Sequence, residues 1–361
     1  MNSMKTLTLT ILPLVLSLGS TPLYAGDTGS HELASSPEVG VRLRREISTH
    51  YVLVAETMRT VVDGEESLSQ RLFDIDCTQN LTVVDEVLEK EGATPTRFRR
   101  DYLKADFEVD SKRSLGGSQS KDRHFQGKGS VQGKGVVFTW LPEEKEFGRY
   151  YDKTEGIEEV LPGLTPDLTI GSIVPAGKVE PGATWDLAPH VLLDLFANGG
   201  DTDFGLKGQV GHTMLRTMRM GLGLNIEQVF GGKEEGTVKA FLMGTELLDG
   251  RELALIQLTF DVKLEHDIPE RAQSGMSIQE LSTGFLVKSN VVHMELSGSG
   301  TLRWDIAGGY LHDTKELRAS ERVGTTLVQT RQKSDGEEES MIQQLVMVGT
   351  MSHSIRCTPV E

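Results

Sequence analysis

The feature that most constrains this chain is a strict alternation of apolar and polar side chains. The longest run covers Val292 to Ile306, where every second residue is apolar or glycine and the residues between are polar or charged. Successive side chains of a β-strand point to opposite faces, so this period of two predicts a strand with one buried and one solvated face. The same pattern occurs from Val41 to Ala55 and from Ile256 to Leu264. Strands of this kind are typical of antiparallel sheets with one wet side.

Turn residues separate these runs and predict how the strands connect. Gly308 and Gly309 follow the longest run and supply the positive φ values that a tight hairpin needs. Two hairpins are predicted from such breaks, one within 136–151 and one within 325–357. By contrast, 110–135 is rich in glycine and lysine and poor in apolar residues, which predicts a long excursion between strands. Strands and helices do not alternate regularly, so a parallel α/β fold is excluded.

Helical spacing of apolar residues occurs only in the middle of the chain. One short amphipathic helix is predicted after Pro189, ending at Gly199 and Gly200. Methionines repeat the spacing further on, and methionine surfaces adapt to varied partners. We predict a mainly β fold with one or two large, curved antiparallel sheets, open-barrel-like, and with this helical segment covering the concave face. The apolar binding surface expected there comprises Leu192, Leu195, Phe196, Met214, Met218 and Met220.

The N-terminus reads as a secretory signal. Lys5 precedes an apolar run from Leu7 to Leu18, and Ala25 offers a small residue at the expected cleavage site. The apolar run is too short to span a bilayer as a helix, and no other stretch is longer, so no membrane span is predicted. We expect an exported protein, periplasmic or extracellular. The predicted division is 1–25 signal peptide, 26–40 flexible leader, 41–156 antiparallel β region, 157–230 helical cover segment and 231–361 antiparallel β region.

The net charge limits the partners that this chain can bind, and the cysteine content indicates whether it contains a disulfide. The chain has 53 acidic and 37 basic residues and a formal net charge of −16, which repels phosphate backbones and excludes nucleic acid as a partner. Cys77 and Cys357 are the only cysteines. An oxidising compartment lets such a pair close, so we predict a disulfide that ties the C-terminal strand to the first sheet. The alternative is two separately buried cysteines that act as small apolar residues.

Two segments carry a resemblance to known proteins. The sequences Val179 to Trp185 (VEPGATW) and Gly298 to Asp305 (GSGTLRWD) resemble segments of uncharacterised exported bacterial proteins. The layout resembles the open β-barrel of the periplasmic lipoprotein carriers. This resemblance implies a lipid chain held between a curved sheet and covering helices, and it assigns no binding residue to this chain. Independently of family, Gly298 and Gly300 lie on the apolar face, where a missing side chain permits a sharp bend or a close approach.

Local catalytic motifs are absent. The sequence contains no G-x-S-x-G elbow, no phosphate-binding loop, and no H-E-x-x-H or close His and Cys pair for zinc. We therefore predict no cofactor and no metal, and we favour a non-enzymatic protein, although sites assembled from distant strands leave no local trace. Lys128 and Lys134, each between glycines, could offer an anion site, but a flexible hairpin loop is the favoured interpretation.

Three hypotheses about function follow. The first is an exported protein that binds a hydrophobic, lipid-like ligand in a concave β cavity, because one-sided strands under a small helical cover can enclose such a cavity. The second is an envelope interaction or scaffold protein, in which the basic excursion contacts an acidic partner protein. The third is a hydrolase whose site is assembled from separate strands.

Overall fold

The computed structural model describes residues 29–33, 38–68, 71–115, 121–175, 177–196, 199–200, 202, 232–267, 286–333 and 336–360. Most of these residues form long β-strands. The strands are β1 (His31–Glu32), β2 (Arg42–Val62), β3 (Glu65–Leu68), β4 (Arg71–Glu91), β5 (Thr94–Leu115), β6 (Lys121–Lys128), β7 (Gly135–Leu141), β8 (Glu146–Tyr151), β9 (Lys178–Val179), β10 (Thr184–Leu187), β11 (Lys233–Leu248), β12 (Arg251–Asp267), β13 (Leu286–Asp305), β14 (Tyr310–Gln332) and β15 (Glu338–Val360).

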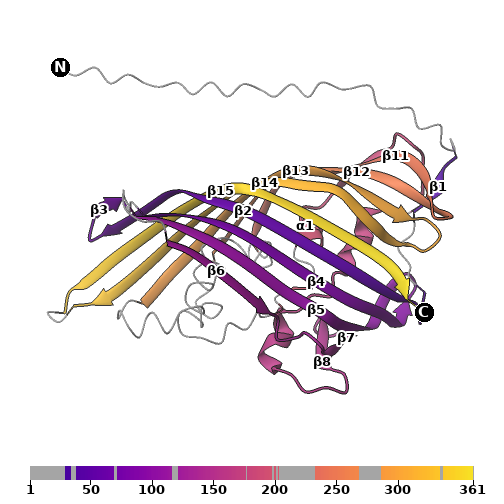
Figure 1. Ribbon diagram of the computed structural model, residues 1–361, viewed down its shortest axis with the longest axis horizontal. Helices are drawn as coiled ribbons and strands as arrows, with labels where there is room; N and C mark the ends of the chain where they lie inside the picture. The colour runs from indigo at the N-terminus through magenta and orange to yellow at the C-terminus, as the bar shows by residue number, and fades with distance from the viewer. Residues whose placement is uncertain are drawn as a thin grey trace.

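One antiparallel sheet contains all of these strands except β1 and β9, which pair with each other. Its order is β10-β11-β12-β13-β14-β15-β2-β4-β5-β7-β8, with β3 paired to β2 and β6 paired to β5. The predicted β regions on either side of the helical segment therefore belong to a single sheet. They meet where β15 pairs with β2, with Ile355 opposite Ile47, in the middle of the strand order (Figure 1).

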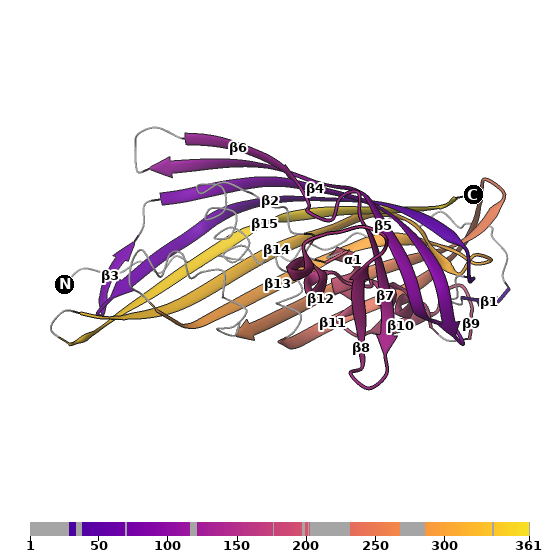
Figure 2. The ribbon, with the colours of Figure 1, turned by 90° about the horizontal axis from the view of Figure 1, so that it is seen from below.

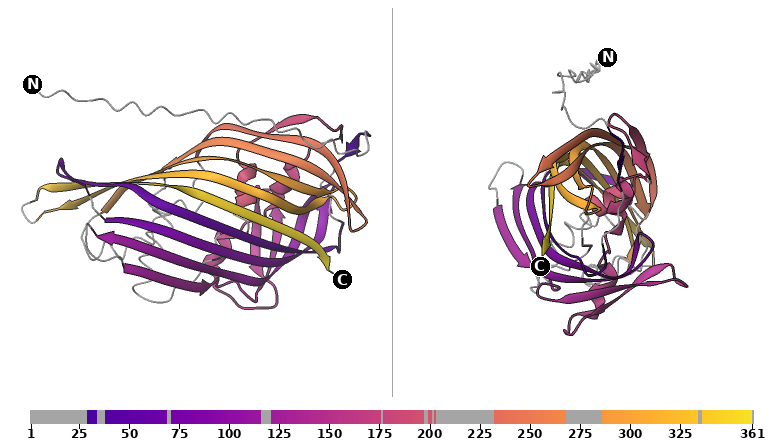
Figure 3. Two further views of the ribbon diagram at one scale, coloured as in Figure 1. Left: turned by 45° about the horizontal axis from the view of Figure 1, so that its top comes forward. Right: turned by 90° about the vertical axis from the view of Figure 1, so that its right-hand side faces the viewer.

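The sheet is strongly curved, and the short helices lie on its concave side (Figures 2 and 3). These are the 3-10 helices η1 (Glu158–Gly163) and η2 (Leu168–Ile173) and the α-helix α1 (Val191–Phe196). Phe196 at the end of α1 packs edge-to-face on Phe260 of β12 and on His353 of β15. The predicted fold is confirmed: a mainly β, open-barrel-like antiparallel sheet whose concave face is covered by a short helical segment.

Burial follows the predicted alternation. Met294, Leu296, Leu302 and Trp304 of β13 are buried, and the polar residues between them are more exposed. Each large apolar side chain buried in this way contributes about 1.5–3 kcal/mol relative to an exposed one. The concave face therefore holds the core of the molecule, and the convex face is in contact with solvent.

Glycine on the apolar face permits close contact between strands. A Cβ at Gly298 would overlap the carbonyl oxygen of Arg318 on β14 and the ring of Phe260 on β12. Gly300 lies at an irregularity in the register between β13 and β14. The close approach expected from these two glycines is confirmed, and a larger residue at either position would push neighbouring strands apart.

Both predicted hairpins are present, as β7 with β8 and β14 with β15. Of the two glycines expected to have a positive φ in the turn between β13 and β14, Gly309 has one and Gly308 does not. The predicted excursion over 110–135 is wrong in most of its length. β5 continues to Leu115, and β6 pairs with it along all eight of its residues. Hydrogen bonding to a neighbouring strand outweighs the low β propensity of this polar, glycine-containing segment.

The predicted disulfide is also wrong. Cys77 on β4 and Cys357 on β15 are free and separately buried, as in the alternative interpretation. The sheet register explains why: both strands flank β2, where Cys77 lies opposite Tyr51 and Cys357 lies opposite Arg45. Six residues of strand separate those two positions, roughly 20 Å along β2. The C-terminal strand is joined to the first strands by backbone hydrogen bonds instead.

Some predictions fall outside the described residues. These are the signal peptide at 1–25, residues 26–28 and 34–37 of the leader, and the methionines Met214, Met218 and Met220. Within the part of the chain that the structure describes, no helix has the length and apolar character needed to cross a membrane.

Candidate functional site

A partly open cavity of about 120 Å³ lies between the concave face of the sheet and the segment that contains η2. Residues far apart in the sequence form it, because β2, β4, β5, β13, β14 and β15 all contribute side chains. Its apolar lining includes Leu43, Phe98, Ile170, Trp304, Leu311 and Ile355.

One side of the cavity is polar and consists of two arginines and two aspartates. Arg45, Asp85 and Asp167 line the cavity, and Arg100 lies behind them. Arg100 is fully buried, with its guanidinium 5.5 Å from the ring centre of Phe98. Two positive and two negative charges make this group neutral overall, so we name it the buried ionic cluster.

Arg100 uses five hydrogen bonds to hold the cover segment against the sheet. Its Nε and one terminal nitrogen donate to the carboxylate of Asp85, at 2.7 and 3.3 Å. Its other contacts are to Asp167 Oδ2 at 3.0 Å and to the carbonyl oxygens of Thr165 and Pro166. Burial favours the neutral form of Arg100, but the charges of Asp85 and Asp167 outweigh it and raise its pKa well above the ordinary value.

Asp167 is the centre of the cluster on the cover segment. Its side chain is fully buried and accepts from Arg45, Arg100, the hydroxyl of Thr165 and the backbone N–H of Gly199. The residue has a positive φ of 52°, a conformation that aspartate tolerates better than most residues. Such strain persists only where the surrounding contacts fix it, so the cluster determines the path of the chain before η2.

Arg45 differs from Arg100 because it retains an unused donor. One terminal nitrogen contacts Asp85 at 2.6 Å and Asp167 at 3.2 Å. Its Nε is buried and has no hydrogen-bond partner among the residues that the structure describes. A buried donor without a partner costs about 1–3 kcal/mol, which an acceptor atom of a ligand would recover.

Burial raises the pKa of Asp85, whereas the charges and hydrogen bonds of the two arginines lower it. The arginines have the larger effect, so the pKa of Asp85 is below the ordinary value.

A second group of buried polar residues lies on the inner face nearer to α1. Thr49 Oγ1 and His353 Nδ1 are 2.8 Å apart, and burial lowers the pKa of His353 to about 3. Glu321 is also buried, which raises its pKa to about 8, and its Oε2 has no hydrogen-bond partner within the described part of the chain. A hydroxyl beside an imidazole resembles a nucleophile with its base, but both residues are buried and Phe196 packs on the imidazole.

The predicted apolar surface on the helix belongs to the core. Leu192, Leu195 and Phe196 are all buried on the concave side, and they are not among the residues that line the cavity. Their contact with a ligand stays a prediction, and so does that of the three methionines. Lys128 ends β6 and Lys134 follows the next turn, where its ammonium group contacts the carbonyl oxygen of Glu155.

Sequence reasoning missed the buried ionic cluster, although the alternation contains a signal for it. Arg45 shares its phase with Leu43 and Ile47, whose side chains face the core, and Arg100 shares its phase with Phe98 and Tyr102. A charged residue in the apolar phase of a strand is either paired or costly, and it therefore points to a site. Asp167 lies in a loop, where no comparable signal exists.

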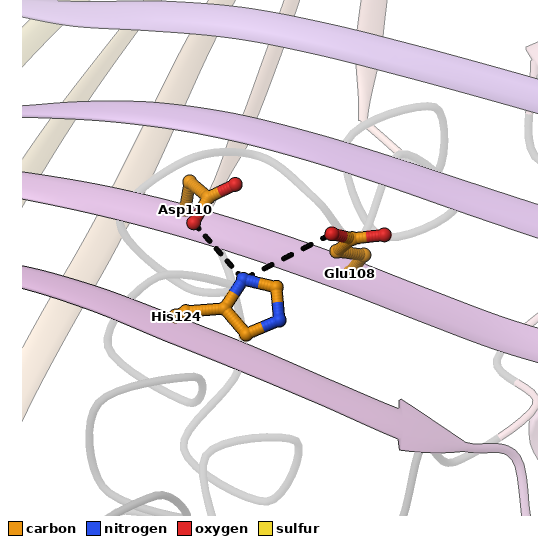
Figure 4. Close-up of side chains that lie close together, drawn as sticks. All are labelled: Glu108, Asp110 and His124. Carbon is orange, nitrogen blue, oxygen red and sulfur yellow. Dashed lines mark hydrogen bonds and ion pairs between the residues drawn. The ribbon is translucent and has the colours of Figure 1, made fainter.

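A third polar group lies on the convex face. Glu108 and Asp110 of β5 and His124 of β6 are exposed, and their ligand atoms all lie within 4.8 Å of one another (Figure 4). His124 Nδ1 is 3.0 Å from Asp110 Oδ1 and 3.9 Å from Glu108 Oε1. Asp110 and His124 lie within the segment that the sequence predicted to be an excursion, and Glu108 lies just before it.

No protein-family model matches this chain, and no curated protein matches its sequence significantly.

Proposed function

We propose that this protein is an exported, non-enzymatic binding protein that holds a hydrophobic, lipid-like ligand on the concave side of its curved sheet. The observation that carries the proposal is the cavity, whose walls are largely apolar and whose polar side includes Arg45, a residue with a buried donor that has no partner among the described residues. Small-molecule sites combine these two properties: apolar walls contribute affinity, and a few polar groups fix orientation.

The size of the cavity limits what part of a ligand it takes. A volume of about 120 Å³ is close to that of an engineered apolar cavity of about 150 Å³ that binds benzene. Pockets for whole drug-sized ligands are larger, about 300–1,000 Å³. The cavity therefore fits one end of an amphipathic molecule, such as the terminal part of an acyl chain or a ring, with the remainder outside it.

The polar side of the cavity favours a ligand with a hydrogen-bond acceptor. Arg45 lines the cavity, and a rotation of its side chain would bring Nε, a donor without a partner among the described residues, to a carbonyl or carboxylate oxygen there. The buried ionic cluster is neutral overall, so it supplies no net attraction for a fully charged group, and an ester or amide carbonyl suits it well. An acyl chain joined to such a carbonyl satisfies both sides of the cavity.

Two experiments test the proposal. Native mass spectrometry of the protein purified from its own host should show a bound lipid. Leu311→Phe adds bulk to the cavity wall and should weaken binding of a fluorescent long-chain fatty acid by about tenfold. Leu264→Phe is the matched control, because Leu264 is equally buried on the inner face but is not among the residues that line the cavity. Equal affinity of the two variants, or a protein that ignores all lipids, would overturn the proposal.

A further inference from the structure

Two histidines and three carboxylates lie next to each other on the convex face of four adjacent strands. Asp76 of β4 is directly opposite Asp110 of β5, and Asp110 is directly opposite His124 of β6. Glu108 lies two residues from Asp110 on the same face of β5, and His50 of β2 contacts Asp76. All five side chains are exposed.

The charges in this group are not balanced. Two aspartates in direct cross-strand opposition repel each other, which is unfavourable in a sheet. Within the described residues, the ion-pair partners of Asp76, Glu108 and Asp110 are the imidazoles of His50 and His124 alone. Three carboxylates thus lie close together with two imidazoles as their partners. The site therefore favours an added cation.

The ligand atoms on β5 and β6 are also placed for one ion. Zn²⁺ in proteins binds nitrogen and oxygen ligands at about 2.0–2.2 Å in a tetrahedral arrangement, so neighbouring ligand atoms are about 3.3 Å apart. The two distances from His124 Nδ1, 3.0 Å to Asp110 and 3.9 Å to Glu108, lie on either side of that value. Small side-chain rotations would bring all three atoms into one coordination sphere (Figure 4).

We propose that Glu108, Asp110 and His124 form a surface binding site for a divalent transition metal, Zn²⁺ in the first instance. An imidazole with carboxylates suits such ions, whereas Ca²⁺ and Mg²⁺ prefer oxygen ligands alone. Water completes the coordination, since the site is open to solvent. His50 with Asp76 lies beside the site, where Asp76 adds negative charge that strengthens the attraction for the metal. The site is on the opposite face of the sheet from the lipid cavity and is independent of it.

Isothermal titration calorimetry with ZnCl₂ tests the proposal on the full exported chain, purified without a histidine tag and treated with a chelator. The wild-type protein should bind one Zn²⁺, and CaCl₂ at the same concentration should give no comparable heat. His124→Gln and Asp110→Asn should each weaken Zn²⁺ binding by about tenfold or more, since each removes a ligand.

His293→Gln is the matched control. His293 is an exposed histidine of β13 whose Nδ1 lies 3.1 Å from a single carboxylate, Glu265, so it reproduces the ion pair without the cluster. Zn²⁺ affinity should be unchanged in this variant. Zn²⁺ should also raise the thermal midpoint of the wild type and of His293→Gln, but not that of His124→Gln, because a ligand that binds the native state stabilises it. Absence of Zn²⁺ binding to the wild type, or equal binding by all variants, would overturn the proposal.

Discussion

The buried ionic cluster and the convex metal site are built from similar side chains on the same sheet, yet their physical situations are opposite. In the cluster, Arg100 and Asp167 are fully buried, and each charge has an opposite charge beside it. On the convex face, Asp76 and Asp110 lie directly opposite each other and are exposed to solvent. Their ion-pair partners are histidines. In the buried ionic cluster, the charged groups bind one another and hold the chain together. On the convex face, the negative charges are not balanced and can bind a cation.

The largest expected effect comes from breaking the cluster. Asp167→Asn removes one charge, leaves Arg100 incompletely compensated, and retains a residue type that tolerates positive φ. We expect the free energy of unfolding to fall by about 3–5 kcal/mol, the usual cost of removing one partner of a buried ion pair. Urea denaturation measures it. Asp110→Asn on the convex face should change the same quantity by no more than about 0.5 kcal/mol, and equal losses would contradict the comparison.

A second prediction concerns Glu321, a buried acid with no opposite charge beside it among the described residues. Its pKa of about 8 in the folded protein exceeds the ordinary value of 4.5, so the native state binds the proton more tightly than the unfolded chain does. Stability from this group is complete below pH 4.5 and is lost as the pH rises toward 8, by at most about 1.4 kcal/mol per pH unit.

Glu321→Gln should remove this part of the pH dependence, and at pH 6 it should raise the free energy of unfolding by about 2 kcal/mol, because it avoids the loss of about 1.4 kcal/mol per pH unit above 4.5. Urea denaturation of both proteins across this pH range provides the measurement. A wild-type stability that is flat from pH 5 to 8, or a variant with the same slope as the wild type, would show that Glu321 is ionised in the folded protein.

The smallest effect is expected on the convex face, where a substitution should increase the free energy of unfolding instead of lowering it. Asp76→Asn relieves the repulsion across β4 and β5, so in metal-free buffer it should raise the free energy of unfolding by about 0.2–1 kcal/mol. Low ionic strength should enlarge the difference, because salt screens exposed charges. A loss of stability on this substitution would mean that the carboxylate has a favourable partner.

The alternation of apolar and polar residues was sufficient to predict the sheet and its solvated and buried faces. The glycines that follow the longest run predicted the turn at Gly309. The alternation could not predict register, because a period of two is the same whichever strand is the neighbour. Without register, Asp76, Asp110 and His124 are three unrelated polar residues, and Cys77 and Cys357 look able to pair. The strand at β6 was missed because its polar residues, lysines and glycine resemble a loop, and only hydrogen bonding to β5 makes it a strand.

The pairing of β2 with β15 has a consequence for how this chain reaches its native state. Thr49 and His353 contact each other across 304 residues of sequence, so the sheet cannot be completed until the end of the chain is available. Contacts between such distant segments slow folding. Until then, β2 and β14 each present a long unsatisfied row of backbone N–H and C=O groups, which is the surface on which other chains aggregate. The strand order therefore implies that nascent chains need protection from aggregation. The same holds for chains truncated at the C-terminus.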